Sequence, residues 1–163
     1  MPRAGMLSTM PKDTDGPEVA VTFVPRGSPS GSARDVVGVR LPAASAYLSV
    51  LRSVTAGLAA RLDFTIDEIE DLRIAVDEAC AMLLPAAVPG AELDVEYELS
   101  PDALRVSVTV LTLDGVQPAR DTFAWTVLSA LAGDAEAYAG QDNRITVSLQ
   151  KVRRRAGTEA DSP

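Results

Sequence analysis

The sequence predicts an α+β fold, a two-layer sandwich in which helices pack on one face of a mostly antiparallel mixed sheet. Two segments with helical periodicity come first, between residues 44 and 84. Segments of alternating apolar and polar residues follow from residue 93 onward, joined by turn sequences. Strands that follow one another through short turns pair antiparallel, so this order favours a sheet covered by the helices on one face.

The 163-residue chain is long enough for one domain with a hydrophobic core. Residues 1–35 contain many Pro, Gly and Ser residues, and we expect a disordered arm and linker there, with a possible short strand at 19–24. The folded domain is expected to span residues 36–152. Residues 153–163 are expected to form a flexible charged tail.

Each of the two long helices has its own sequence signals. The first is expected at about 44–61, where a stripe recurs at spacings of three and four residues: Leu48, Leu51, Thr55, Leu58 and Leu62. The second begins after Thr65, which forms a capping box with Glu68. Pro85 ends this helix, whose apolar stripe is Ile69, Leu72, Val76, Cys80 and Leu83.

The strands surround a third, shorter helix. A first strand is expected at 36–41 and a hairpin at 93–110, where the alternation is interrupted by a Ser-Pro-Asp turn. Residues 111–120 form a loop, Thr122 caps the short helix, and a last strand is expected at 145–149.

The composition excludes several classes of function. A formal charge of −8 disfavours direct binding to nucleic acid. The absence of histidine removes the usual general base and zinc ligand, so no metal site is expected. The single cysteine, Cys80, cannot form an internal disulfide, and no basic segment followed by an apolar run opens the chain, so we expect a cytoplasmic protein. No run approaches the ~20 apolar residues of a membrane span, and no membrane partner is expected.

Glu78 is a carboxylate in unusually apolar surroundings. Its neighbours three and four positions away on the helix are Ile74, Ala75, Ala81 and Met82. A helix that is apolar on both faces is usually buried on both, so we expect Glu78 to line a cleft, where functional carboxylates are found. The structural alternative is that Glu78 caps a backbone group or pairs with Arg40 or Arg105.

Other candidate sites have simpler explanations. An acidic cluster at the start of the second helix is suited to a basic partner, but such clusters are usually solvated and favoured by the helix dipole; its members are Asp67, Glu68, Glu70 and Asp71. Cys80 belongs to the apolar stripe and is expected to be an unreactive core thiol. Trp125 and Phe123 are expected to pack in the core or at an interface.

Residues 52–84, RSVTAGLAARLDFTIDEIEDLRIAVDEACAMLL, resemble the RsbW/SpoIIAB family of anti-sigma factors, part of the GHKL group of ATPases and histidine-kinase-like domains. In that family a helix ending in Leu-Asp leads into a second helix that carries the N-box, Glu-x-x-x-Asn. The resemblance implies that residues 36–152 form a histidine-kinase-like ATPase domain with a Bergerat-type fold. It also implies that Glu78 is the general base and that ATP or ADP is a candidate cofactor.

The nucleotide motifs of the family are only partly present. Met82 stands where the N-box has the Asn that holds Mg²⁺, and a thioether is a poor ligand for that ion. The Asp-x-Gly-x-Gly motif is reduced to a displaced Asp114-Gly115, and the later glycines are absent from 121–125. The candidate nucleotide-binding residues are therefore Glu78, Met82, Asp114 and Gly115, and we expect a degenerate kinase.

Arg52 is the candidate partner-binding residue. The family places an arginine ten residues before the Leu-Asp pair, where it contacts both the sigma factor and its competitor, and Arg52 has that spacing from Leu62. Its position beside the apolar stripe predicts an exposed side chain. An ordinary surface arginine with a packed stem is the alternative.

The resemblance implies an anti-sigma factor, a homodimer that sequesters a stress-type or sporulation-type RNA polymerase sigma factor. An anti-anti-sigma protein with a STAS domain would release it. Two alternatives stay open: an active serine protein kinase that phosphorylates the STAS antagonist with ATP and Mg²⁺, and a non-catalytic sensor of a nucleotide or another small ligand.

Overall fold

The computed structural model describes residues 19–26 and 34–154. Within them lie six strands and three helices, in the order β1 (Ala20–Arg26), β2 (Arg34–Pro42), α1 (Leu48–Arg61), α2 (Ile66–Leu83), β3 (Glu92–Ser100), β4 (Ala103–Leu111), α3 (Phe123–Ala132), β5 (Asp134–Ala139) and β6 (Arg144–Val152). Most of the disordered arm and linker expected at 1–35, and most of the tail expected at 153–163, lie outside the described residues.

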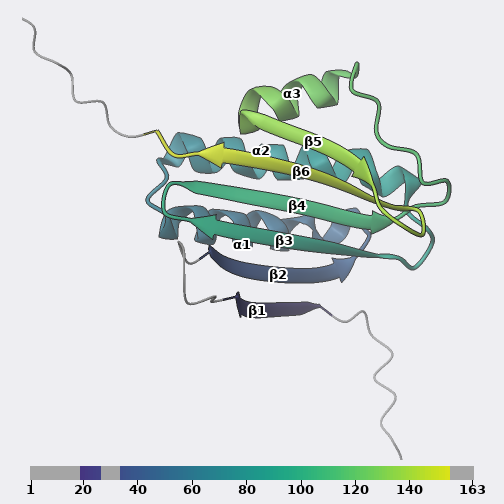
Figure 1. The fold of residues 1–163 in the computed structure, drawn as a ribbon, viewed down its shortest axis with the longest axis horizontal. Coiled ribbons are helices and arrows are strands. Elements are labelled where there is room, and N and C mark those ends of the chain that lie inside the picture. Colours follow the sequence, from purple (N-terminus) through teal and green to yellow (C-terminus); the bar gives the residue numbers. More distant parts are fainter. Residues whose placement is uncertain (1–18, 27–33, 155–163) are drawn as a thin grey trace, which may run out of the picture.

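The strands form one sheet in the order β1-β2-β3-β4-β6-β5 (Figure 1). Every pair of described strands is antiparallel, so the predicted mostly antiparallel sheet is confirmed, without the parallel pair that a mixed sheet would contain. One register row is buried from β2 to β5: Val39, Val95, Val108, Val147 and Ala137. The row continues in β1 at Val21, which is exposed. This row faces the helices.

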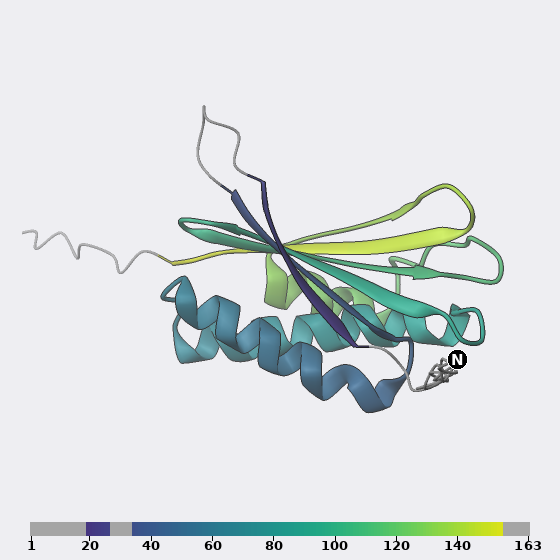
Figure 2. The same ribbon diagram turned by 90° about the horizontal axis from the view of Figure 1, so that it is seen from below.

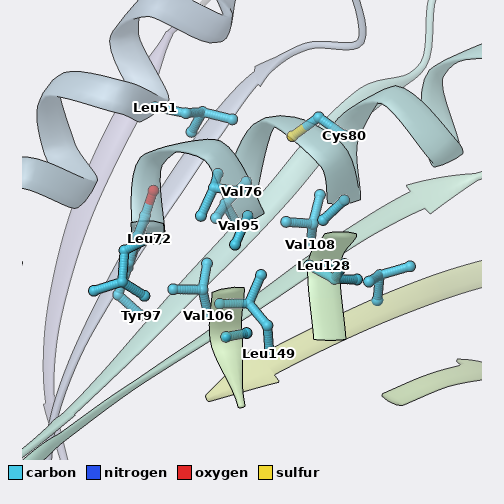
Figure 3. Close-up of a cluster of buried hydrophobic side chains, with 14 of the residues drawn as sticks. Leu51, Leu72, Val76, Cys80, Val95, Tyr97, Val106, Val108, Leu128 and Leu149 are labelled. Atoms are coloured by element: carbon cyan, nitrogen blue, oxygen red, sulfur yellow. The ribbon is translucent and has the colours of Figure 1, made fainter. Parts of the chain in front are cut away.

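All three helices lie on one face of the sheet (Figure 2), as predicted. α2 is central and packs against both α1 and α3. Leu51 of α1, Leu72 and Val76 of α2 and Leu128 of α3 are fully buried against strand residues such as Val106. Figure 3 shows these side chains converging between the two layers. The central position of α2 agrees with its burial, because seven of its residues are buried, compared with three of α1.

Local sequence signals account for most element ends. Thr65 and Glu68 form the predicted capping box at the start of α2. Thr122 caps α3 by accepting a hydrogen bond from the backbone N–H of Trp125, and Gly133 ends this helix with a φ of +90°. A strand forms near the expected 19–24 and pairs with β2.

β5 was not predicted. Its residues are alanines and polar side chains, and alanine has a weak preference for strands. Only Ala137 is buried, which is a weak signal of alternation. β5 lies at the edge of the sheet, where pairing with β6 decides the conformation rather than local preference.

The face of the sheet away from the helices is polar. Its central strand β3 carries Asp94, Glu96 and Glu98 on this side. Asp94 pairs with Arg40 at 2.6 Å and with Arg144 at 3.3 Å. Two hollows of about 550 and 660 Å³ lie among strands and one turn, and no residue of α2 lines either of them.

Candidate functional site

Arg52 and Asp77 join the exposed sides of α1 and α2. Arg52 follows the buried Leu51 on α1, and its side chain is 45% exposed. Its Nε donates a hydrogen bond of 2.6 Å to Oδ2 of Asp77 on α2. The exposure of Arg52 agrees with the sequence prediction. The partner-binding role of Arg52 stays a prediction.

Asp77 was missed by the sequence reasoning. Its side chain is 25% exposed, yet its Oδ1 is buried and has no hydrogen-bond partner among the described residues. No local pattern indicates the contact, because Arg52 lies 25 residues earlier on a different helix. The sequence feature that could have pointed to Asp77 is its negative charge directly before Glu78.

Glu78 does not have the surroundings that its neighbours predicted. Ala75 is fully buried, but Ile74 is 45% exposed and Ala81 is also exposed. The second face of α2 is therefore buried only in part, and the predicted two-sided burial is wrong. A helix on the outer layer of a two-layer sandwich has only one side against the sheet, which explains the difference.

The alternative prediction, that Glu78 pairs with Arg40 or Arg105, is also wrong. Arg40 contacts Asp94, and Arg105 donates to Gln150. Glu78 is half-buried, and its carboxylate has no hydrogen bond or ion pair with another described residue. Its role as a general base stays a prediction.

Met82 lies one turn after Glu78 on α2 and packs partly against the core. Asp114 and Gly115 lie in the loop after β4, and Oδ1 of Asp114 accepts a hydrogen bond from the backbone N–H of Val116. No hydrogen bond between described residues joins this loop turn to Glu78. Two of the four candidate nucleotide-binding residues are thus adjacent on one helix, and the other two form a separate turn.

The loop after β4 is attached to the edge of the sheet. The guanidinium of Arg120 donates to the carbonyl oxygen of Ala137 in β5 and stacks over the ring of Trp125. With the side-chain amide of Gln117 oriented to satisfy both of its polar atoms, its nitrogen donates to the same carbonyl oxygen. Its oxygen then accepts a hydrogen bond from the backbone N–H of Ala139. These contacts cover part of the free edge of β5 with side chains of the loop.

ATP with Mg²⁺ is the cofactor that the resemblance implies, and Met82 does not fit it, because a thioether is a poor ligand for Mg²⁺ in the place of the N-box amide. A Cβ at position 115 would lie 2.7 Å from Oδ1 of Asn143, and the φ of +68° there favours glycine, so the turn itself accounts for Gly115.

The acidic start of α2 is partly occupied by the chain itself. Glu68 accepts hydrogen bonds from the backbone N–H groups of Thr65 and Arg154. Asp71 accepts from Nζ of Lys151, which also donates to the carbonyl oxygen of Leu131. Burial opposes ionisation of Glu68, but these backbone hydrogen bonds, the Thr65 hydroxyl and the charge of Lys151 outweigh it, so the pKa of Glu68 is below its usual value.

Cys80 is fully buried on the core face of α2, as predicted. Burial, with a smaller effect of the nearby Asp77 charge, raises the pKa of this thiol to about 12. A thiol with this pKa is almost wholly protonated at neutral pH and is a poor nucleophile. Cys80 therefore acts as a small core side chain.

Known relatives agree with this architecture. The chain is 34% identical, over 112 residues, to a protein of Mycobacterium tuberculosis named anti-sigma-F factor RsbW; the match covers 66% of each chain. This chain is similar in sequence to RsbW proteins. No protein-family model matches it.

Other relatives of this RsbW-like chain are named serine-protein kinase RsbW. One from Bacillus subtilis is 35% identical over 77 residues, covering 45% of this chain and 48% of the relative. One from Halalkalibacterium halodurans is 34% identical over 76 residues, covering 46% and 47% respectively. The chain thus matches just under two thirds of the mycobacterial relative's length and about half of that of the other two.

None of the helices within the described residues is both long and apolar enough to cross a membrane. Two surfaces of the structure carry exposed charged groups. One is the polar face of the sheet, and the other is the exposed side of α1 and α2 that carries Arg52, Asp77 and Glu78.

Proposed function

We propose that this RsbW-like chain is an anti-sigma factor, which binds a stress-type or sporulation-type RNA polymerase sigma factor in the cytoplasm. The observation that carries the proposal is the exposed guanidinium of Arg52, fixed on α1 at the position that matches the family's contact arginine. The name of the mycobacterial relative supports the same function.

Arg52 has the properties of an interface anchor. Arginine is enriched among the residues that contribute most to protein–protein binding, because its planar group forms two parallel hydrogen bonds to a carboxylate. Its Nε is occupied by Asp77, whereas no described residue accepts a hydrogen bond from its two Nη groups. These two groups are suited to a carboxylate on the sigma factor.

An anti-anti-sigma protein with a STAS domain is proposed as the antagonist, competing for the same arginine. The chain is proposed to act as a homodimer. Both statements rest on the resemblance to the RsbW/SpoIIAB family. The negative charge of the chain favours a protein partner over a nucleic acid.

A serine protein kinase is the second candidate, because relatives from Bacillus subtilis and Halalkalibacterium halodurans are named as such. The half-buried Glu78, without a partner among the described residues, is available as a base in that reading. Met82 in the place of the magnesium-binding amide argues against it. A non-catalytic sensor of a nucleotide or another small ligand is the third candidate.

The proposal is tested by co-purification from the native cell with tagged chain, followed by identification of the bound proteins. We expect an RNA polymerase sigma factor in the wild-type sample and its loss with Arg52→Ala. Arg61→Ala is the matched control, since Arg61 is an exposed arginine in the last turn of the same helix. Retention of the sigma factor by the Arg52 variant would remove this residue from the interface.

A phosphate-transfer assay distinguishes a serine protein kinase from an anti-sigma factor without kinase activity. Purified chain is incubated with labelled ATP, Mg²⁺ and the candidate STAS protein, and Glu78→Gln is run beside it. We expect no transfer with either protein. Transfer that is lost with Glu78→Gln would establish the kinase as the function of the chain.

A further inference from the structure

We propose that Asp77 is a positioning residue for Arg52: it holds the guanidinium by Nε so that the two Nη groups are presented to a carboxylate of the partner. The inference rests on the proposed function, because it assumes that Arg52 contacts a protein partner. The role of Asp77 itself comes from the contacts between α1 and α2.

The geometry of the pair leaves one edge of the guanidinium available. A carboxylate can bind arginine along the edge formed by Nε and one Nη, or at the end formed by both Nη groups. Asp77 uses Nε alone, at 2.6 Å. The end of the group therefore stays available, and a partner's carboxylate can bind there in two-point fashion without displacing Asp77.

The unused oxygen of Asp77 shows how closely the two residues depend on each other. Oδ1 is buried and has no partner, so Arg52 supplies the one hydrogen bond that the carboxylate receives from the described residues. Arg73, one turn earlier on α2, donates to Glu70 instead, and its own buried Nε has no partner. Asp77 is thus held by a single arginine, and it holds that arginine in return.

Fixing the guanidinium before binding has a defined physical effect. A free arginine side chain has many rotamers, and ordering them on association opposes binding. Asp77 lies on a different helix from Arg52, so the hydrogen bond restricts the arginine to conformations that bridge α1 and α2. The arginine side chain is therefore ordered during folding, and less conformational entropy is lost when the partner binds.

The opposite role of Asp77 makes a different prediction. If Asp77 were a competitor that masks Arg52, removing its negative charge would strengthen binding to an acidic partner. If it positions Arg52 by a hydrogen bond, an uncharged residue with an acceptor oxygen would preserve binding and a residue without one would weaken it. Asp77→Asn and Asp77→Ala separate these two cases.

The test measures the dissociation constant of the co-purified sigma factor for the full-length chain by titration calorimetry, using Asp77→Asn and Asp77→Ala. We expect Asp77→Ala to weaken binding roughly two- to five-fold, the range of exposed ion pairs, and Asp77→Asn to retain most of the affinity. In an Arg52→Ala background, replacing Asp77 is expected to leave the dissociation constant unchanged.

Each contrary outcome has its own meaning. Tighter binding by both Asp77 variants would overturn the positioning role and make Asp77 a competitor. Equal affinity of Asp77→Ala and wild type would also overturn it. A wild-type affinity in Arg52→Ala alone would instead refute the proposed contact of Arg52. Thermal unfolding of each variant excludes a loss of fold as the cause of weaker binding.

Discussion

The carboxylate of Glu68, in the first turn of α2, accepts a hydrogen bond of 2.9 Å from the backbone N–H of Arg154, 86 residues further along the chain. The same side chain completes the capping box with Thr65. One acidic residue therefore both begins the central helix and fixes the chain after the last strand. Lys151, bound to Asp71, strengthens this junction.

Glu68→Gln is expected to lower the free energy of unfolding at pH 7 by about 1–2 kcal/mol, because a charged acceptor in a helix cap is replaced by a neutral one. Since the pKa of Glu68 is lowered on folding, its contribution is present above the usual pKa of a glutamate and is lost as the pH falls through the lower folded value. The measurement is urea unfolding at several pH values. A difference between wild type and variant that stays constant from pH 7 to the acid limit would contradict the account.

The buried hydroxyl groups of Tyr97 and Thr55 lie 3.0 Å apart and link β3 to α1. Tyr97→Phe is expected to cost about 1–3 kcal/mol, because it leaves the hydroxyl of Thr55 buried without a partner. The matched double variant, Tyr97→Phe with Thr55→Val, is expected to cost less than the sum of the two single changes. Strict additivity in chemical denaturation would show that the two hydroxyls are not coupled.

Tyr97 also predicts an alkaline limit of stability. Burial raises the pKa of Tyr97 well above its usual value, and the hydrogen bond with Thr55 offsets only part of this effect. The stabilisation is present below pH 10 and is lost as the pH rises through the folded-state pKa, because the unfolded chain releases the proton first. Melting temperatures between pH 8 and pH 11 are expected to fall more steeply for the wild type than for Tyr97→Phe. Parallel curves would contradict this assignment.

Much of the fold could be predicted from the sequence, because the helices and central strands are locally consistent. The capping box of Thr65, the stop at Pro85 and the alternation of β3 and β4 each correspond to an element of the structure. β5 was missed because its conformation depends on pairing with β6.

The candidate site could be predicted less well. The periodicity of α1 predicted that Arg52 is exposed, but the contact with Asp77 depends on how α1 and α2 pack. The cleft expected around Glu78 assumed a second layer over α2, and the exposure of Ile74 and Ala81 shows that the described residues provide none. Contacts between separate elements were therefore beyond what local patterns indicate.

Nucleotide binding is tested by thermal shift. We expect ATP or ADP, with and without Mg²⁺, to leave the melting temperature unchanged, since a ligand raises it only if it binds the folded state. Met82→Asn is the informative companion, because it restores the amide of the N-box and leaves unchanged the loop after β4, which Thr112 bonds to the carbonyl oxygen of Asn143. A magnesium-dependent rise in the wild type would contradict the degenerate reading of the site.

A chain that sequesters a sigma factor must compete with core RNA polymerase for that factor. Labelled sigma factor is bound to core polymerase, purified chain is added, and the fraction of sigma factor on the polymerase is measured. We expect wild-type chain and Arg61→Ala both to deplete this fraction, and Arg52→Ala to do so only at much higher concentration. A fraction that does not change at any concentration of the wild-type chain would contradict sequestration.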